Sequence, residues 1–228
     1  MTSTPEGLPT PKGKSRLIRH FEKRSIENHN DAWTDLWDTD KSDMWDRGRP
    51  SPALIDLLEQ REEVLSPIAA DSRRKTVLVL RCGKGYDVVM LVLHGFDVVG
   101  LEISQKGVSA AEYSEASKRE RGPVSFIKGD FFKSESVNGR IFDVIQDYTF
   151  LCALHPTMRS QWALRMADLF IPGGLLVCLE FPLFKDPSHP GPPWPCKVGT
   201  GTCWPRVVMG FCILPHQIGK AILGWEAS

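Results

Sequence analysis

The chain has no excess of charge of either sign and no long apolar run. Its 28 lysines and arginines balance 28 aspartates and glutamates, so it lacks the broad positive field typical of nucleic-acid-binding proteins. No stretch approaches the roughly 18 to 20 apolar residues that cross a bilayer. The longest run, residues 88–93, has the length of a core segment. We therefore expect neither a nucleic-acid partner nor a membrane partner.

Signals for secretion and for metal binding are also missing. The N-terminal residues are rich in Ser, Thr, Pro and Lys and contain no apolar segment of the kind that directs secretion. The six cysteines include no CxxC pair, and those near the C-terminus, with His216, lack the spacing of zinc ligands. We expect reduced thiols, no metal site and a cytoplasmic location.

Three regions of the chain differ in composition. We expect residues 1–25 to form a flexible N-terminal tail, because they supply little to bury, and residues 26–198 to form the folded domain. Residues 199–228 make an atypical C-terminal tail that is nearly free of acids. Within this tail, residues 207–214 have the composition of one strand. The strands that close the sheet are therefore expected to be incomplete.

Strand and helix patterns alternate through the domain. Apolar and β-branched runs predict strands at 76–80, 96–101, 124–128, 142–145 and 175–181; helices are predicted from Asn30, over 52–64, 87–93 and 104–121, and from His155. This alternation is typical of an α/β protein with a mainly parallel sheet and helices on both faces. Ligands bind such sheets at the carboxyl ends of the strands. The candidate loops are therefore 81–86, 102–105, 129–132 and 146–152.

A glycine-containing loop and a later acid form the first candidate site. Gly83 and Gly85 let the backbone pass close to a ligand, and Glu102 ends the second strand, where a carboxylate can bind ribose hydroxyls. The phosphate-binding pattern GxGxxG is absent. Its absence disfavours NAD or a flavin and favours S-adenosylmethionine, whose nucleoside carries no phosphate. The alternative is an ordinary turn followed by a strand-end Glu that faces solvent.

Two further groups can complete a nucleoside site. Asp130 can accept the amino group of adenine, and Phe131 can line the ring pocket; alternatively they are a helix-capping Asp and a core Phe. Trp33, Trp37 and Trp45 precede the sheet, and aromatic faces attract a sulfonium through the cation–π effect. For any one of these tryptophans, packing of a helix onto the domain is the simpler explanation.

Together these pieces resemble the thiopurine S-methyltransferase family, including its branch of thiol and halide methyltransferases. The resemblance runs from about Trp33 to Val198. It rests on segments that occur in the same order, namely W-x3-W at 33–37, MWDRGRPSPAL at 44–54, LRCGKGYDVVML at 80–91, VVGLEIS at 98–104, KGDFF at 128–132, FDVIQDYTFLCALHPTMRSQWA at 142–163, IPGGLLV at 171–177 and HPGPPW at 189–194. It implies a Rossmann-like fold of seven strands, the last pair reversed, and S-adenosylmethionine as cofactor.

The resemblance also implies roles for individual positions. Combined with the spacing argument, it predicts a cofactor site made of Trp33, Trp37, Trp45, Arg81, Gly83, Glu102, Asp130, Phe131 and Tyr148. Arg81 stands where family members have Gly or Leu, so we expect it to contribute only its backbone. Tyr148 is expected beside the methionyl sulfur and the acceptor. Tyr148 and Asp147 are the expected catalytic residues, with Asp147 or His155 as the candidate proton acceptor.

Four interpretations of the function follow, one leading and three alternative. The leading one is an S-adenosylmethionine-dependent methyltransferase that acts, as a monomer, on a small-molecule thiol. The first alternative is methylation of a halide or thiocyanate. The second is a non-catalytic remnant of the family that binds a partner, because the closing strands are incomplete. A nicotinamide oxidoreductase is a distant third, disfavoured by the missing GxGxxG.

Overall fold

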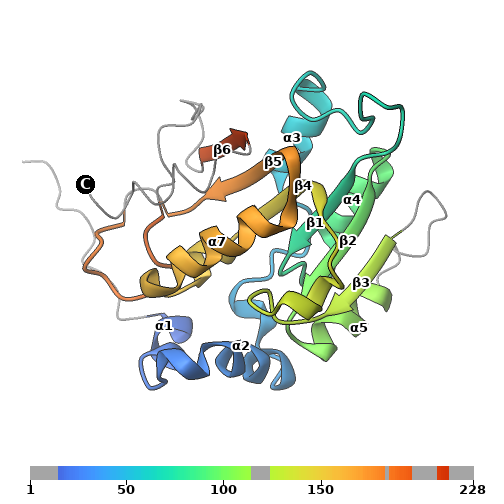
Figure 1. Ribbon diagram of the computed structural model, residues 1–228. Helices are drawn as coiled ribbons and strands as arrows, with labels where there is room; N and C mark the ends of the chain where they lie inside the picture. The colour runs from blue at the N-terminus through green and yellow to red at the C-terminus, as the bar shows by residue number, and fades with distance from the viewer. Residues whose placement is uncertain (1–14, 114–123, 183–184, 197–209, 216–228) are drawn as a thin grey trace, which may run out of the picture.

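A twisted sheet of six strands forms the centre of the structure (Figure 1). The computed structural model describes residues 15–113, 124–182, 185–196 and 210–215. The strands are β1 (Thr76–Leu80), β2 (Asp97–Glu102), β3 (Val124–Lys128), β4 (Phe142–Tyr148), β5 (Phe170–Glu180) and β6 (Gly210–Pro215). Their order is β3-β2-β1-β4-β5-β6. The first five strands pair in parallel, and β6 pairs with β5 in the antiparallel direction.

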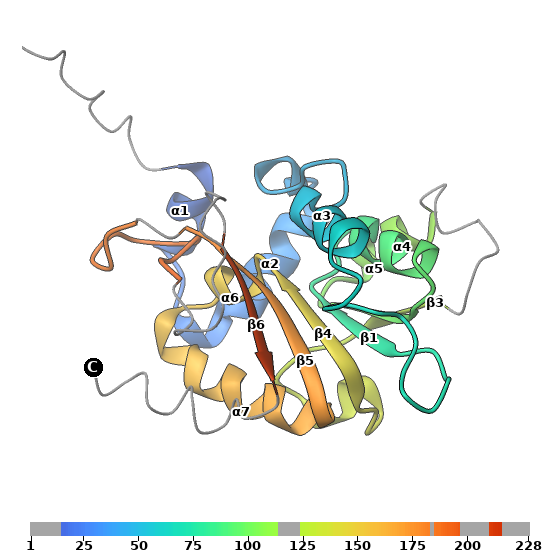
Figure 2. The same cartoon turned by 90° about the horizontal axis from the view of Figure 1, so that it is seen from above.

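Helices connect the strands and cover the sheet. They are α1 (Arg16–Phe21), α2 (His29–Asp38), α3 (Pro52–Gln60), α4 (Tyr86–Leu93), α5 (Gln105–Tyr113), α6 (Phe150–Ala153) and α7 (Arg159–Leu169), with short 3-10 turns at Ile26–Asn28, Ser42–Met44, Ser134–Val137 and Pro156–Met158. Figure 2 shows α3 and α4 on one side of the sheet and α7 on the other. The expected α/β fold with a mainly parallel sheet is confirmed. In the described residues, no helix has the length and apolar character needed to cross a bilayer.

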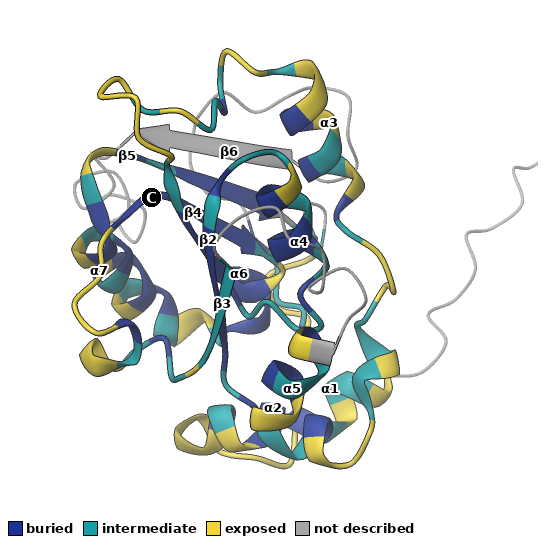
Figure 3. Cartoon of the chain, turned by 90° about the vertical axis from the view of Figure 1, so that its right-hand side faces the viewer, coloured by how far each residue is buried: buried dark blue, intermediate teal, exposed yellow. Residues whose placement is uncertain are grey.

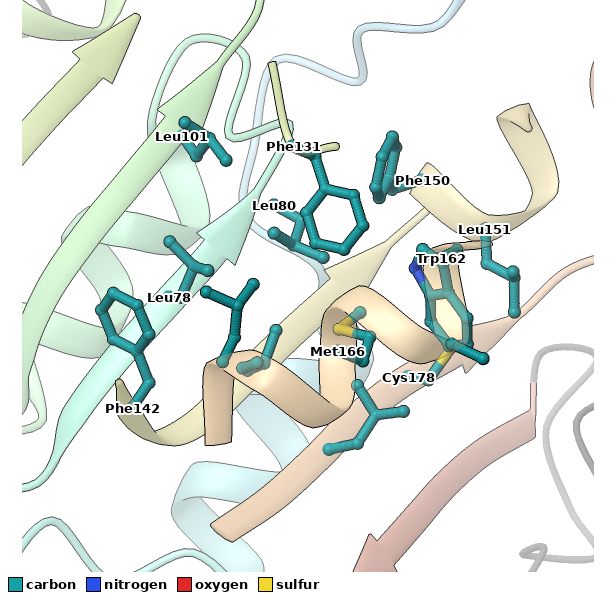
Figure 4. Packing of buried hydrophobic residues seen from close by; sticks show 14 of the residues in the cluster. Leu78, Leu80, Leu101, Phe131, Phe142, Phe150, Leu151, Trp162, Met166 and Cys178 are labelled. Atoms are coloured by element: carbon teal, nitrogen blue, oxygen red, sulfur yellow. The ribbon is translucent and has the colours of Figure 1, made fainter. Parts of the chain in front are cut away.

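Alternating side chains of the strands supply two cores, as the period of two in a strand requires. Val77, Val79 and Val144 face α3 and α4, where Leu54 and Leu91 complete one cluster. On the opposite face a second cluster joins the sheet to α6 and α7; its members include Leu78, Leu80, Ile145, Phe150, Trp162 and Met166 (Figure 4). Figure 3 shows the buried residues concentrated on the strands and on the inner sides of these helices.

A buried carboxylate joins the start of β4 to the start of β1. Asp143 accepts hydrogen bonds from the two terminal nitrogens of Arg73, at 2.6 and 2.7 Å, and from the backbone N–H of Thr76, at 2.8 Å. Burial opposes ionisation of this carboxylate, but these donors outweigh it and lower the pKa of Asp143. The contact fixes the two central strands at the edge opposite the candidate site.

The structure begins earlier than the composition predicted. The prediction of a tail over residues 1–25 extended too far, because residues 16–21 form α1, whose Phe21 is buried and packs on the ring of Trp33 at a centroid distance of 4.9 Å. Phe21 packs on a residue of another helix, so the polar composition of residues 1–25 gave no sign of this contact. Residues 1–14 lie outside the described part of the chain.

Two strands also differ from expectation. β5 begins at Phe170 and not at Leu175, so it includes residues that precede the predicted strand, and its pairing with β4 is irregular between Phe142 and Val144. β4 extends to Tyr148 and therefore includes residues that were expected in a loop. The single strand expected in the C-terminal tail is present as β6, and the described residues contain six strands where the resemblance implied seven.

Candidate functional site

A cavity of about 560 Å³ opens at the carboxyl ends of β1, β2 and β4. These strands meet where the chain order of the sheet reverses, between β1 and β4, which is the usual ligand site of an open α/β sheet. The residues around the cavity come from α2, from the segment that follows it and from three strand ends; they include Trp33, Trp37, Trp45, Arg47, Arg49, Arg81, Gly83, Glu102, Gln146 and Tyr148.

The loop after β1 forms the floor of the cavity. Arg81, Gly83 and Gly85 all have positive φ, at 47, 54 and 77°. Gly85 begins α4, and a Cβ at this position would lie 3.0 Å from ring carbons of Phe126. A glycine is therefore required there by its conformation and by the space available. The tight loop brings the backbone of Gly83 to the carboxylate of Glu102.

Glu102 is buried beside the cavity and is fixed by backbone donors. Its carboxylate accepts hydrogen bonds from the N–H groups of Ile103 at 2.8 Å, Gly83 at 3.2 Å and Ser104 at 3.3 Å. Burial raises its pKa, while Arg81 and these N–H groups act in the opposite direction. A carboxylate has about four acceptor positions. Three are used, so Glu102 can accept one further hydroxyl without losing a backbone bond.

Three tryptophans form the roof of the cavity. The ring of Trp45 lies nearly perpendicular to those of Trp33 and Trp37, at centroid distances of 5.4 and 5.5 Å. The indole N–H of Trp33 donates to Nε2 of His29 at 3.2 Å. Burial and the nearby Arg81 lower the pKa of His29 to about 4, so its ring is neutral at pH 7 and can accept this bond.

Asp130 and Phe131 reach the same edge but lie outside the main cavity. They line a small neighbouring hollow, together with Asn30, Arg81 and Phe150. The carboxylate of Asp130 accepts from the side-chain amide of Asn30 at 2.9 Å. Phe131 is buried and packs on Phe150 at a centroid distance of 5.1 Å (Figure 4). Asp130 and Phe131, the residues expected to bind adenine, therefore lie together next to the cavity, with Arg81 on the boundary between the two hollows.

The side chain of Arg81 is the main difference from the expected site. Its guanidinium carbon lies 4.7 Å from the centre of the Trp33 ring and 5.3 Å from that of Phe150. Burial lowers its pKa to about 10, although the carboxylates of Glu102, Asp130 and Asp147 act in the opposite direction. The group is thus charged at pH 7. Arg81 contributes its side chain as well as its backbone, and it borders both hollows.

The two expected catalytic residues point to opposite faces of β4. Tyr148 lines the cavity, and burial raises the pKa of its phenol. Asp147 is buried in the α7 face and does not line the cavity. Its carboxylate accepts from the backbone of Phe150 and Leu151, at 3.0 and 3.1 Å, and from the indole of Trp162, at 3.2 Å. The two backbone bonds cap the first turn of α6, so the structure gives Asp147 a capping role.

Several residues of the site carried no clear signal in the sequence. Gln146 lines the cavity, donates to Asp87 at 2.9 Å and, among the residues that the structure describes, finds no partner for its side-chain oxygen. Gly107 of α5 has no room for a side chain, because a Cβ would lie 2.8 Å from Glu102.

His155, the other candidate proton acceptor, forms a hydrogen bond with Thr157 and does not line the cavity. In the described residues, no cluster of His, Cys, Asp and Glu suits a metal ion.

The cavity suits an adenosyl sulfonium ligand in part. Glu102 offers an acceptor for a ribose hydroxyl, and three indoles offer faces that attract a cation. Gly83 has open space on its cavity side, since an added Cβ would meet only Trp37, at 3.9 Å. The charged side chain of Arg81 does not suit such a ligand, because it places a second positive charge beside the cavity. Chemically, the arrangement can enclose a cationic nucleoside and exclude water from a small nucleophile beside Tyr148.

Comparison with known proteins gives concordant results. The thiopurine S-methyltransferase family profile matches residues 28–200. Probable thiol methyltransferase 2 of Arabidopsis thaliana is 35% identical over 178 residues, which cover 78% of this chain and 73% of that protein. Thiocyanate methyltransferase 1 of the same plant is 31% identical over 193 residues, 85% of this chain and 76% of that protein. Thiopurine S-methyltransferase of Pseudomonas fluorescens (strain SBW25) is 33% identical over 132 residues, 52% of this chain and 59% of that protein.

Proposed function

We propose, from the premise that this chain belongs to the thiopurine S-methyltransferase family, that it transfers a methyl group from S-adenosylmethionine to a small-molecule thiol. The observation that carries the proposal is the cavity at the carboxyl ends of β1, β2 and β4, whose wall contains three tryptophans and the fixed carboxylate of Glu102. This pairing of an aromatic enclosure with a ribose acceptor suits the cofactor of the family.

The cofactor is proposed to lie along the floor of the cavity. Glu102 would bind a ribose hydroxyl, the backbone at Gly83 would allow close approach, and Trp33, Trp37 and Trp45 would cover the sulfonium. When bound, S-adenosylmethionine supplies a methyl carbon that a thiolate sulfur attacks in line, so that one carbon–sulfur bond forms as another breaks. The protein contributes orientation of the reactants and exclusion of water.

This reaction needs little help from a general base. A thiol has a pKa of about 8.5, so a few per cent of it is thiolate at pH 7. Tyr148 and Trp45 are proposed to line the acceptor side and to keep it dry. Asp147 is left out of the proposed chemistry, because its carboxylate is held in the core by three donors.

Positive charge at the entrance favours an anionic acceptor. Arg47 and Arg49 line the cavity and lie close enough to Tyr148 to lower its pKa, against the larger effect of burial. Two other cations of the cavity wall are paired, Lys84 with Asp46 at 2.6 Å and Arg16 with Asp43 at 3.1 Å. A thiolate fits this field. Thiocyanate and iodide are also anions that the positive charge would attract, so they remain alternative acceptors. One similar plant protein is named a thiocyanate methyltransferase.

A methyl-transfer assay tests the proposal. The purified chain is incubated with methyl-labelled S-adenosylmethionine and, separately, an aryl thiol, an alkyl thiol, thiocyanate or iodide, and the labelled product is identified by mass spectrometry. We expect labelled thioether from at least one thiol. Product from thiocyanate or iodide alone would favour the alternative. A folded chain that methylates none of them would support the non-catalytic interpretation.

The proposal also covers the oligomeric state, the cellular location and the macromolecular partners of the protein. We propose that the protein works as a monomer in the cytoplasm, without a nucleic-acid or membrane partner. The balanced charge supports the absence of a nucleic-acid partner. Light scattering after size-exclusion chromatography would reveal a dimer, and cell fractionation would reveal another location.

A further inference from the structure

The side chain of Arg81 lies on the aromatic surface that covers the proposed cofactor site. Its guanidinium carbon is 4.7 Å from the centre of the Trp33 ring and 5.3 Å from that of Phe150. Trp33 belongs to the roof of the main cavity, while Phe150 lines the smaller hollow. The positive charge therefore lies at the boundary between the two spaces.

The backbone holds Arg81 in this position. Its φ of 47° is in the left-handed region, which is unfavourable for a residue with a Cβ. The next residue, Cys82, is held by a backbone hydrogen bond to Leu101 of β2, at 3.1 Å. The side chain thus starts from a fixed point on the floor of the cavity.

A cation on this surface affects ligands according to their charge. S-adenosylmethionine carries a sulfonium, whereas its product, S-adenosylhomocysteine, carries a neutral thioether at the same place. Both ligands must fit the same nucleoside site, so steric effects of Arg81 act on both. Repulsion between the guanidinium and a second cation acts on the sulfonium alone.

We propose that Arg81 sets the relative affinity of this site for sulfonium and thioether ligands, favouring the neutral product over the cationic cofactor. The inference rests on the proposed function, because it assumes that the cavity binds S-adenosylmethionine. Its consequence is a methyltransferase that retains its product and is inhibited by it.

Calorimetric titration of the full chain tests this inference. The wild type and Arg81→Leu are each titrated with S-adenosylmethionine and with S-adenosylhomocysteine, without an acceptor. Removal of the charge should raise the affinity for the sulfonium, relative to the thioether, by about tenfold or more. Arg81→Lys keeps the charge and should keep the wild-type ratio. Arg81→Gly removes the charge at a backbone conformation that glycine prefers, which provides a folded variant if Arg81→Leu is unstable.

The outcomes separate this inference from the proposed function. If removal of the Arg81 charge raises the affinity for both ligands equally, the side chain obstructs the site sterically and the proposal of charge selection is overturned. The same conclusion follows if the wild type binds neither ligand and the variants bind both. An unchanged ratio in Arg81→Leu and Arg81→Gly would overturn it as well. Failure of every variant to bind either ligand would overturn the cofactor site itself. Binding of the thioether but not the sulfonium by the wild type, with both bound by Arg81→Leu, supports the inference.

Discussion

Acidification should destabilise the protein through one buried histidine. His29 is 4% exposed, and its Nε2 accepts the indole N–H of Trp33 at 3.2 Å, so the neutral ring suits the folded state. Burial, with a further effect of Arg81, lowers its pKa from 6.5 to about 4. In the unfolded chain the ordinary pKa is restored. The stabilisation is therefore complete above pH 6.5 and is lost as the pH falls towards 4. Its full size is about 3 kcal/mol, at about 1.4 kcal/mol for each tenfold change in proton affinity.

The assay is urea unfolding, followed by tryptophan fluorescence, between pH 4.5 and 7.5. Wild type should lose about 2 to 3 kcal/mol more than His29→Gln over this range, because the variant has no titrating ring at this position. His189 is exposed, so His189→Gln should follow the wild type. Equal pH dependence of wild type and His29→Gln would refute the reasoning. Binding of S-adenosylhomocysteine to the folded protein should weaken only as the pH approaches 4, where His29 of the folded state becomes protonated and can no longer accept from Trp33.

Three further variants test other parts of the structure. Arg73→Ala leaves the buried carboxylate of Asp143 without its bidentate partner and should lower the free energy of unfolding measured in urea; the loss should be modest, because Arg73 is 44% exposed, and an unchanged unfolding midpoint would contradict the role of this contact. Gly85→Ala places a methyl group 3.0 Å from Phe126 at a φ of 77° and should cost about 1–3 kcal/mol; an unchanged unfolding midpoint would contradict the steric argument. Glu102→Gln should weaken binding of S-adenosylhomocysteine by about 1–3 kcal/mol in calorimetry, and unchanged affinity would remove Glu102 from the site.

The sheet was predictable because its signals are local. The strands at 76–80 and 124–128 have the predicted bounds, since β-branched and apolar runs flanked by polar residues leave few alternatives. The helix that carries Trp33 and Trp37 was also predicted, and it begins at His29, one residue before the expected start at Asn30. By contrast, α1 was missed because its burial depends on contact with Trp33, which the local composition does not encode.

The site was predictable as a set of positions but not as a set of orientations. The edge of the sheet brings Trp33, Glu102 and Tyr148 to one cavity, as the topology of a parallel sheet requires. Asp147 was expected beside Tyr148, yet neighbouring residues of a strand point to opposite faces. The direction of the Arg81 side chain depends on the ring positions of Trp33 and Phe150, which come from distant parts of the chain. The orientation of the Arg81 side chain therefore follows from packing and not from spacing.

The most direct test of the account is calorimetric titration of the purified chain with S-adenosylhomocysteine. We predict one site of micromolar affinity in the wild type and a clear loss of affinity in Glu102→Ala. A chain that is folded by circular dichroism and releases no heat of binding would contradict the assignment of the cavity, and with it the proposed methyl transfer.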